Sequence, residues 1–292
     1  MTVASEVSTA AARDGTPLLT RHWPAGGQPW AAVLLLHGIA EHSGRHERTG
    51  GLLAAAGLDT HAFDLRGHGA SGGRPVYVER WDVYLDDVAG RMDALPAGLP
   101  RVLLGHSMGA LIALTYTLDG RRPQPGLLVL SALPLEASVP RWQLLAAPVL
   151  GRLLPTLVLA NPIDPGQLAN DPAVGSGYAA DPLVRPRSTA RLGMEFFGAM
   201  SRGRREAAFL DRPTLVLHGA DDTLVPPSAS APLADLSVVE RRVYPGLRHE
   251  TMNEPEGPRV VAEVVAWLRE RILGPGVDPS AEWPDQPGPA PR

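Results

Sequence analysis

Short apolar runs recur along the chain and alternate with longer stretches whose apolar residues follow a helical spacing. The runs lie at 31–36, 60–65, 102–104, 127–130 and 214–217. Runs of this length predict strands, most of them buried on both faces of a sheet. The stretches at 47–56, 81–95, 110–118 and 258–273 predict helices. Strands that alternate with helices predict an α/β fold with a mostly parallel sheet and helices on both faces.

Two further strands are predicted nearer the ends of the chain. Residues 18–23 mix polar and apolar side chains, so we expect this strand at an edge of the sheet. Residues 238–244 are predicted to form the last strand, which ends in a loop containing Gly246 and His249. Loops that follow parallel strands gather at one end of the sheet, where ligands bind.

One segment breaks this alternation. Between 133 and 208, short apolar pieces are separated by prolines, eight of them between 140 and 186. The segment is too long for a structureless loop, so we interpret it as a helical cap above the carboxyl ends of the strands. The predicted organisation is a core over 1–132, a cap over 133–208, the rest of the core over 209–273, and a tail over 274–292. The tail is rich in proline and glycine and is predicted to be disordered.

The main candidate for chemistry is the sequence Gly105-His106-Ser107-Met108-Gly109, which lies between an apolar strand and an apolar helix. In the G-x-S-x-G arrangement, a strained strand-to-helix turn raises the serine above the sheet, and small flanking residues let the strand and helix approach closely. Ser107 is therefore a candidate nucleophile. The alternative is a tight turn in which the serine only caps the helix.

A serine nucleophile needs a base and an acid that orients the base, in the chain order serine, acid, histidine. His249 follows every candidate acid and is predicted to be the base. Asp221 and Asp222 both follow the strand at 214–217; the spacing from Gly219 favours Asp222, and turn formation by both is the alternative.

The developing oxyanion needs two backbone N–H donors. The predicted donors are Met108, directly after the nucleophile, and Ile39, in the loop after the strand at 31–36.

Composition excludes several other kinds of chemistry. The 292 residues carry 27 basic and 31 acidic side chains, a net charge of −4, so no nucleic-acid partner is expected. The chain has neither cysteine nor lysine, which excludes disulfides, thiolate metal sites and lysine bases. No secretory signal or membrane-length apolar run is present, so a cytoplasmic protein is expected.

Two motifs suggest other ligands, but both are interpreted as structural. His37, His42 and His46 cluster in sequence, yet a zinc site needs further ligands at suitable spacing, so a role in bracing the loop is favoured and no metal is expected. The glycine-rich segment from Asp64 to Ser71 lacks the G-x-G-x-x-G register and is predicted to be a turn.

Five segments together resemble the monoacylglycerol lipase family of α/β-hydrolases, with bacterial members the most similar. They are His37–Arg45, Asp64–Gly73, Gly105–Gly109, His218–Asp222 and Tyr244–Glu250. The resemblance covers about residues 8–273. It implies an α/β-hydrolase fold with a helical cap after the sixth strand. It also implies Ser107 as nucleophile, Asp222 as acid, His249 as base, and the N–H groups of Ile39 and Met108 as oxyanion hole. His46 departs from the family pattern, which usually has tyrosine at this position.

The resemblance implies a serine ester hydrolase that cleaves monoacylglycerols through an acyl-enzyme and needs no cofactor. A carboxylesterase, lysophospholipase or amidase of the same fold is the first alternative, and a hydrolase-like binding receptor is the second. The segment 143–160 is rich in leucine and valine, so we expect it to line an acyl tunnel or to make transient contact with a membrane surface. Packing of these residues against the core is the alternative. No feature of the sequence indicates an oligomeric state.

Overall fold

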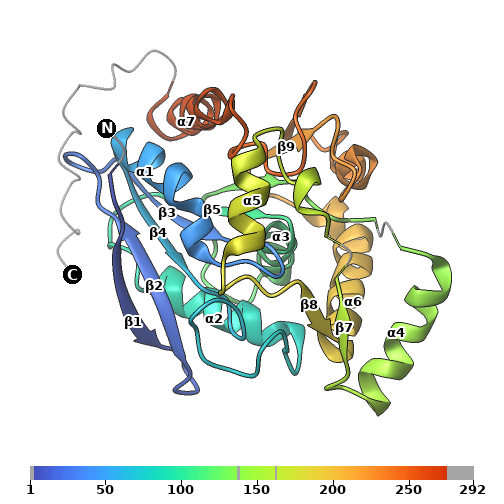
Figure 1. The fold of residues 1–292 in the computed structure, drawn as a ribbon. Coiled ribbons are helices and arrows are strands. Elements are labelled where there is room, and N and C mark those ends of the chain that lie inside the picture. Colours follow the sequence, from blue (N-terminus) through green and yellow to red (C-terminus); the bar gives the residue numbers. More distant parts are fainter. Residues whose placement is uncertain (1–2, 137–138, 162, 275–292) are drawn as a thin grey trace.

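An eight-stranded sheet forms the centre of the protein in the computed structural model, which describes residues 3–136, 139–161 and 163–274 (Figure 1). The strands lie in the order β1 (Glu6–Ala11), β2 (Pro17–Trp23), β4 (Leu58–Phe63), β3 (Ala31–Leu36), β5 (Arg101–His106), β6 (Leu127–Ser131), β9 (Thr214–Gly219) and β10 (Val239–Tyr244). Strand β2 pairs antiparallel with both β1 and β4, and all pairs from β4 to β10 are parallel. The mostly parallel sheet is therefore confirmed.

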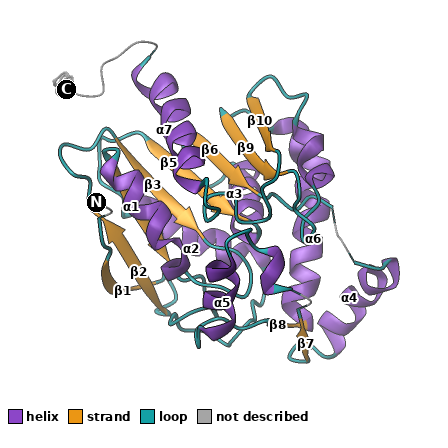
Figure 2. Cartoon of the chain, turned by 45° about the horizontal axis from the view of Figure 1, so that its top comes forward, coloured by secondary structure: helices purple, strands orange, loops and turns teal. Residues whose placement is uncertain are grey.

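Helices cover both faces of the sheet. Alternate residues of β3 enter two different apolar clusters, because successive side chains of a strand point to opposite faces. One cluster includes residues of α2 (Trp81–Asp93) and α3 (Met108–Asp119). The other includes residues of α1 (Glu47–Ala55) and α7 (Gly257–Leu273), which Figure 2 shows on the same side of the sheet. The strands between these layers are buried on both sides, as their apolar sequences predict.

The expected edge position of β2 is wrong. Strand β1, which the apolar pattern did not predict, pairs with β2 from Pro17 to His22 and forms the edge instead. Nearly all residues of β1 are exposed, and its sequence contains mostly small and polar side chains. An edge strand of this kind is held mainly by backbone hydrogen bonds, so it leaves little hydrophobic signal in the sequence.

The segment between β6 and β9 contains helices and a small hairpin. Its elements are α4 (Arg141–Leu153), β7 (Val158–Ala160), α5 (Pro172–Ala180), β8 (Arg187–Thr189) and α6 (Ala190–Glu206), with one-turn helices at Pro165–Gln167 and Ala207–Phe209. Strands β7 and β8 pair antiparallel with each other. Figure 1 shows α4 on the outside of the molecule, with α6 between it and the sheet.

Helix α6 differs from the short cap helices that the prolines suggested. It is 17 residues long, and Leu192, Ala199 and Met200 on its buried face belong to the same apolar cluster as α3. The division into core and cap at 133 and 208 remains a prediction, since α6 packs directly on the core. The predicted disordered tail lies outside the described residues, apart from Gly274.

Candidate active site

Ser107 lies at a sharp turn between β5 and α3. Its backbone angles, φ 53° and ψ −117°, are strained for a residue with a side chain, and its amide donates to the carbonyl of Ser131 at 2.9 Å. A Cβ at Gly105 would collide with the backbone of Gly109, and a Cβ at Gly109 would collide with the carbonyl of Leu36. The glycines are thus required by close backbone approach, and the serine occupies the position expected of a nucleophile elbow.

The loops after β9 and β10 bring an aspartate and a histidine together. His249 Nδ1 lies 2.8 Å from Asp222 Oδ2, and the other carboxylate oxygen accepts hydrogen bonds from the amides of Leu224 and Val225. Asp221 is exposed, and its amide donates to the carbonyl of Leu247. Of the two adjacent aspartates, the structure therefore places Asp222 against the histidine.

Opposite charges control the ionisation of this pair. Burial opposes ionisation of Asp222, but the charge of His249 and hydrogen bonds from His218, His249 and Val225 hold the pKa of the carboxyl well below its usual range. Burial also opposes protonation of His249, but the neighbouring Asp222 carboxylate outweighs it and raises the pKa of the imidazole. Asp222 is therefore ionised at neutral pH. An Nδ1–H donated to it leaves Nε2 of a neutral His249 as an acceptor.

The two predicted oxyanion donors come from two segments that are far apart in the sequence. Ile39 belongs to the loop after β3 and lines the same pocket as Ser107, and Met108 is the first residue of α3. Neither amide N–H donates to an acceptor within the described residues. The N-terminus of α3 adds the partial positive charge of a helix dipole at this point.

A buried polar network holds the loop after β3 in place. Glu41 accepts a hydrogen bond from the Gly38 amide at 2.6 Å and from Arg45 at 2.8 Å. Arg45 also makes two hydrogen bonds with the carboxylate of Glu250, the residue after His249, and its guanidinium lies 4.9 Å from the centre of the Tyr178 ring. This network ties the loop that carries Ile39 to the loop that carries His249.

Each of the three clustered histidines has its own partner. His37 contacts the carbonyl of Gly38 through Nδ1 and accepts the Leu65 amide at Nε2. Burial lowers the pKa of His37 to about 3, so the ring is neutral. His42 pairs with Asp181 at 2.8 Å, and His46 lies 3.3 Å from Glu41. These contacts brace the loop.

The glycine-rich segment that follows β4 is a turn closed around Asp64. The Asp64 carboxylate accepts the amides of Ser43 and Ala70 at 2.9 Å. Its oxygens are thereby used within the protein, and the segment is a structural turn.

Ser107, His249 and the polar network open into one pocket of about 290 Å³. Its wall is formed largely by apolar side chains from the insertion and the flanking loops: Ile39, Pro134, Val139, Ile163, Leu168, Phe196, Phe197, Met200, Leu224 and Val225. Four polar residues of the lining, Glu41, Arg45, Tyr178 and Glu250, are joined through contacts of Arg45, and Glu136, Asn161 and Thr223 also line the pocket. The site therefore combines a hydroxyl, an imidazole paired with a carboxylate, and an apolar enclosure.

Comparison with known families identifies the kind of protein that carries this site. The family model described as "Serine aminopeptidase, S33" matches residues 27–256. The chain belongs to the serine aminopeptidase S33 family.

Relatives within this family carry a more specific name. The chain is 36% identical to the monoacylglycerol lipase of Mycolicibacterium smegmatis, over 84% of this chain and 90% of that one. It is 33% identical to human monoglyceride lipase, over 90% of each chain. The crystal structure of the Paleococcus ferrophilus monoacylglycerol lipase superposes with a TM-score of 0.78 at 31% identity, over 90% of this chain and 98% of that one. The resemblance to monoacylglycerol lipases and the α/β-hydrolase fold are both confirmed.

The sequence analysis did not assign roles to several residues that the structure brings together at the pocket. Glu41, Arg45 and Glu250 lie within motifs that carried the resemblance, so their placement beside the candidate triad was available from those motifs. His218 was also missed. Its Nε2 lies 3.4 Å from Asp222 and donates to the carbonyl of Val225 at 2.8 Å, which anchors the loop holding the aspartate.

Proposed function

We propose that this protein is a monoacylglycerol lipase in which Ser107, His249 and Asp222 form the catalytic triad. The observation that carries the proposal is the convergence of a strained serine elbow and a buried His249–Asp222 pair on one largely apolar pocket. The names of the M. smegmatis and human relatives supply the substrate class.

The proposed reaction proceeds in two halves. His249 Nε2 accepts the Ser107 proton while the serine oxygen attacks the ester carbonyl, and the resulting oxyanion is stabilised by the amides of Ile39 and Met108. The proton passes from His249 to the departing glycerol oxygen, which leaves an acyl-enzyme. A water molecule, deprotonated by His249, then attacks the acyl group, and the fatty acid leaves as Ser107 recovers its proton. Asp222 orients His249 and stabilises its cation throughout.

The lining of the pocket supports an ester with one apolar chain and one polar head. Phe196, Phe197 and Met200 offer an apolar surface to an acyl chain, whereas Arg45 and Glu250 offer polar groups. Apolar enclosure with a few placed polar groups is typical of sites that bind such amphipathic molecules.

The first test measures hydrolysis of esters from p-nitrophenyl acetate to long-chain monoacylglycerols by wild type and Ser107→Ala. We expect the highest kcat/KM on monoacylglycerols, and a loss of at least about 10⁴-fold in the variant. Activity confined to acetate and butyrate esters would instead identify a carboxylesterase. Full activity in Ser107→Ala would refute the nucleophile, and an inactive wild type on every ester would favour a binding receptor.

We further propose that α4 contacts a membrane surface and thereby gives the pocket access to its lipid substrate. Trp142, Leu145, Val149 and Leu153 recur at helical spacing and are 65%, 78%, 54% and 74% exposed. Arg141 and Arg152 lie near the two ends of the helix. An exposed apolar face with flanking cations is suited to the interface of a bilayer. No helix in the described part of the chain is both long and apolar enough to cross one.

Co-sedimentation with vesicles of neutral and anionic lipid tests this contact. We expect wild type to bind, and the triple variant Leu145→Ser/Val149→Ser/Leu153→Ser to bind at least about tenfold more weakly. The variant should keep its kcat/KM on a short soluble ester, which serves as the control for folding. Equal binding of both proteins, or none by wild type, would refute the membrane role of α4.

A further inference from the structure

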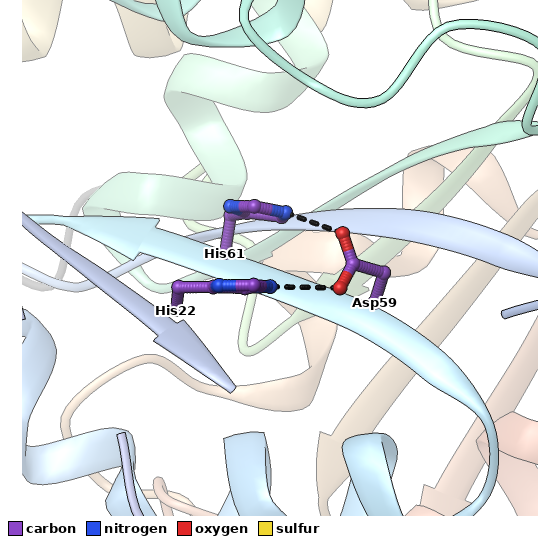
Figure 3. A group of neighbouring side chains, drawn as sticks. All are labelled: His22, Asp59 and His61. Carbon is purple, nitrogen blue, oxygen red and sulfur yellow. Dashed lines mark hydrogen bonds and ion pairs between the residues drawn. The ribbon is translucent and has the colours of Figure 1, made fainter. Parts of the chain in front are cut away.

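Three side chains of types that can bind a metal ion lie together on the sheet, outside the pocket. His22 comes from β2, and Asp59 and His61 come from β4. Figure 3 shows the two imidazoles one above the other, both directed at the carboxylate of Asp59. Nε2 of His22 lies 2.7 Å from Oδ1 of Asp59, and Nε2 of His61 lies 2.7 Å from Oδ2.

The register of the sheet fixes this arrangement. His22 and His61 are direct partners across the antiparallel β2–β4 pair, so their side chains share one face. Asp59 precedes His61 by two residues on β4 and therefore lies on the same face. The imidazole rings stack with their centres 4.3 Å apart and an angle of 9° between the planes. The backbone thus holds both rings beside the carboxylate without any loop.

We propose that His22, Asp59 and His61 form a binding site for one divalent transition-metal ion such as Zn²⁺. Two imidazoles and one carboxylate with a water molecule are a ligand set that zinc accepts in four-coordinate sites. One donor atom from each residue lies within 4.8 Å of the others. Bonds of about 2.0–2.2 Å place tetrahedral ligand atoms roughly 3.3–3.6 Å apart. The carboxylate must therefore move less than about 1 Å from each ring, and the rings must tilt toward a common point.

Burial and charge favour the forms that bind a metal. Burial lowers the pKa of His61, so this ring is neutral at neutral pH and does not need to lose a charge. Burial opposes ionisation of Asp59, but the two histidines outweigh it and lower the pKa of the carboxyl. The side chains of His22 and His61 are 34% and 24% exposed, which gives an ion and a water ligand access from solvent.

A neighbouring carboxylate can support the metal-bound form of His22. A metal on Nε2 requires the ring proton to lie on Nδ1, and Oε2 of Glu6 lies 3.9 Å from that nitrogen. Glu6 is the direct partner of His22 on β1. Histidine ligands commonly donate their second N–H to a carboxylate in this way. The bound ion would join β2 to β4, with Glu6 extending the contact to the edge strand.

The experiment is a calorimetric titration of the full, chelator-treated chain with ZnCl₂. We expect wild type to bind one equivalent at this site, and the double variant His22→Gln/His61→Gln to bind it at least about tenfold more weakly. Glutamine keeps an N–H donor for Asp59, so the variant preserves hydrogen bonding across the strands. The matched control is His42→Gln, which removes another histidine paired with an aspartate but leaves the proposed site intact.

Retention of wild-type affinity in the control, and a Zn²⁺-dependent rise in Tm for wild type but not for the double variant, would support the proposal. No uptake by wild type, or equal uptake by wild type and the double variant, would overturn it. If the double variant does not fold, an NMR measurement on wild type alone still tests the proposal. Paramagnetic Co²⁺ should selectively broaden the imidazole NMR signals of His22 and His61, and broadening centred on other histidines would overturn the assignment.

Discussion

The lining of the pocket and helix α4 depart in opposite directions from the usual distribution of side chains. Beside Ser107, the polar residues Glu41, Asp222 and His249 are buried. On α4, by contrast, large apolar residues are exposed, and Gly151 is the only buried residue of this helix. Buried polar groups and exposed apolar patches are the informative exceptions in a folded protein, because both require compensation. In the pocket the compensation is a set of hydrogen bonds inside the protein, whereas for α4 we propose an apolar phase outside it.

Helix α6 sharpens the contrast, since it belongs to the same insertion as α4. Both helices are amphipathic, but α6 buries Leu192 and Met200 in the apolar cluster that also contains residues of α3. The two helices show that an apolar face alone does not reveal whether it packs inward or remains outside. Three experiments, given from the largest expected effect to the smallest, test these differences between buried polar groups and exposed apolar groups.

The largest effect is expected at the buried carboxylate. Asp222→Asn removes the charge that, in the proposed mechanism, orients and stabilises protonated His249, so kcat on a soluble ester should fall about 10³–10⁴-fold. Asp221→Asn is the matched control, because the adjacent aspartate is exposed and its change should alter kcat less than about twofold. Steady-state kinetics of both variants would check this. A larger loss in Asp221→Asn than in Asp222→Asn would reverse the assignment.

A smaller effect is expected from shortening apolar side chains on the two helices. Leu192→Ala leaves a cavity in the apolar cluster that α6 shares with α3 and should lower the free energy of unfolding by about 2–5 kcal/mol. Leu145→Ala on α4 removes an exposed side chain and should change it by less than about 0.5 kcal/mol. Denaturant unfolding of both variants measures the difference. Equal destabilisation would show that the outer face of α4 is buried in solution.

The smallest effect is expected from pH. In the proposed mechanism His249 must be neutral to accept the serine proton, and the Asp222 carboxylate raises the pKa of His249 against the effect of burial. The activity should therefore be complete above the raised pKa and fall about tenfold per pH unit below it. The midpoint of this acid limb should lie above about 6.5, the ordinary pKa of histidine. A profile of kcat/KM for an uncharged ester gives the midpoint, and a value below that of free histidine would contradict the proposed pairing.

Much of this architecture follows from local pattern. The strand at Ala31–Leu36 was predicted at its observed bounds, because a continuous apolar run fits only a strand covered on both faces. The serine elbow was predicted because glycines at 105 and 109 are needed wherever a strand and helix meet so closely. The fold that these elements imply has its catalytic residues in the chain order serine, acid, histidine, and this order guided the prediction of Ser107, Asp222 and His249.

Other features depend on contacts between segments far apart in the chain. The sequence by itself favoured Asp222 over Asp221 by spacing and by resemblance, but the exposure of one carboxylate and the contact of the other with His249 come from the packing of the β9 and β10 loops. Likewise, nothing in the separate sequences of β1, β2 and β4 placed β1 at the edge or set His22 against Asp59 and His61. Strand register decides these contacts, because backbone pairing, rather than any local propensity, determines which side chains meet across a sheet.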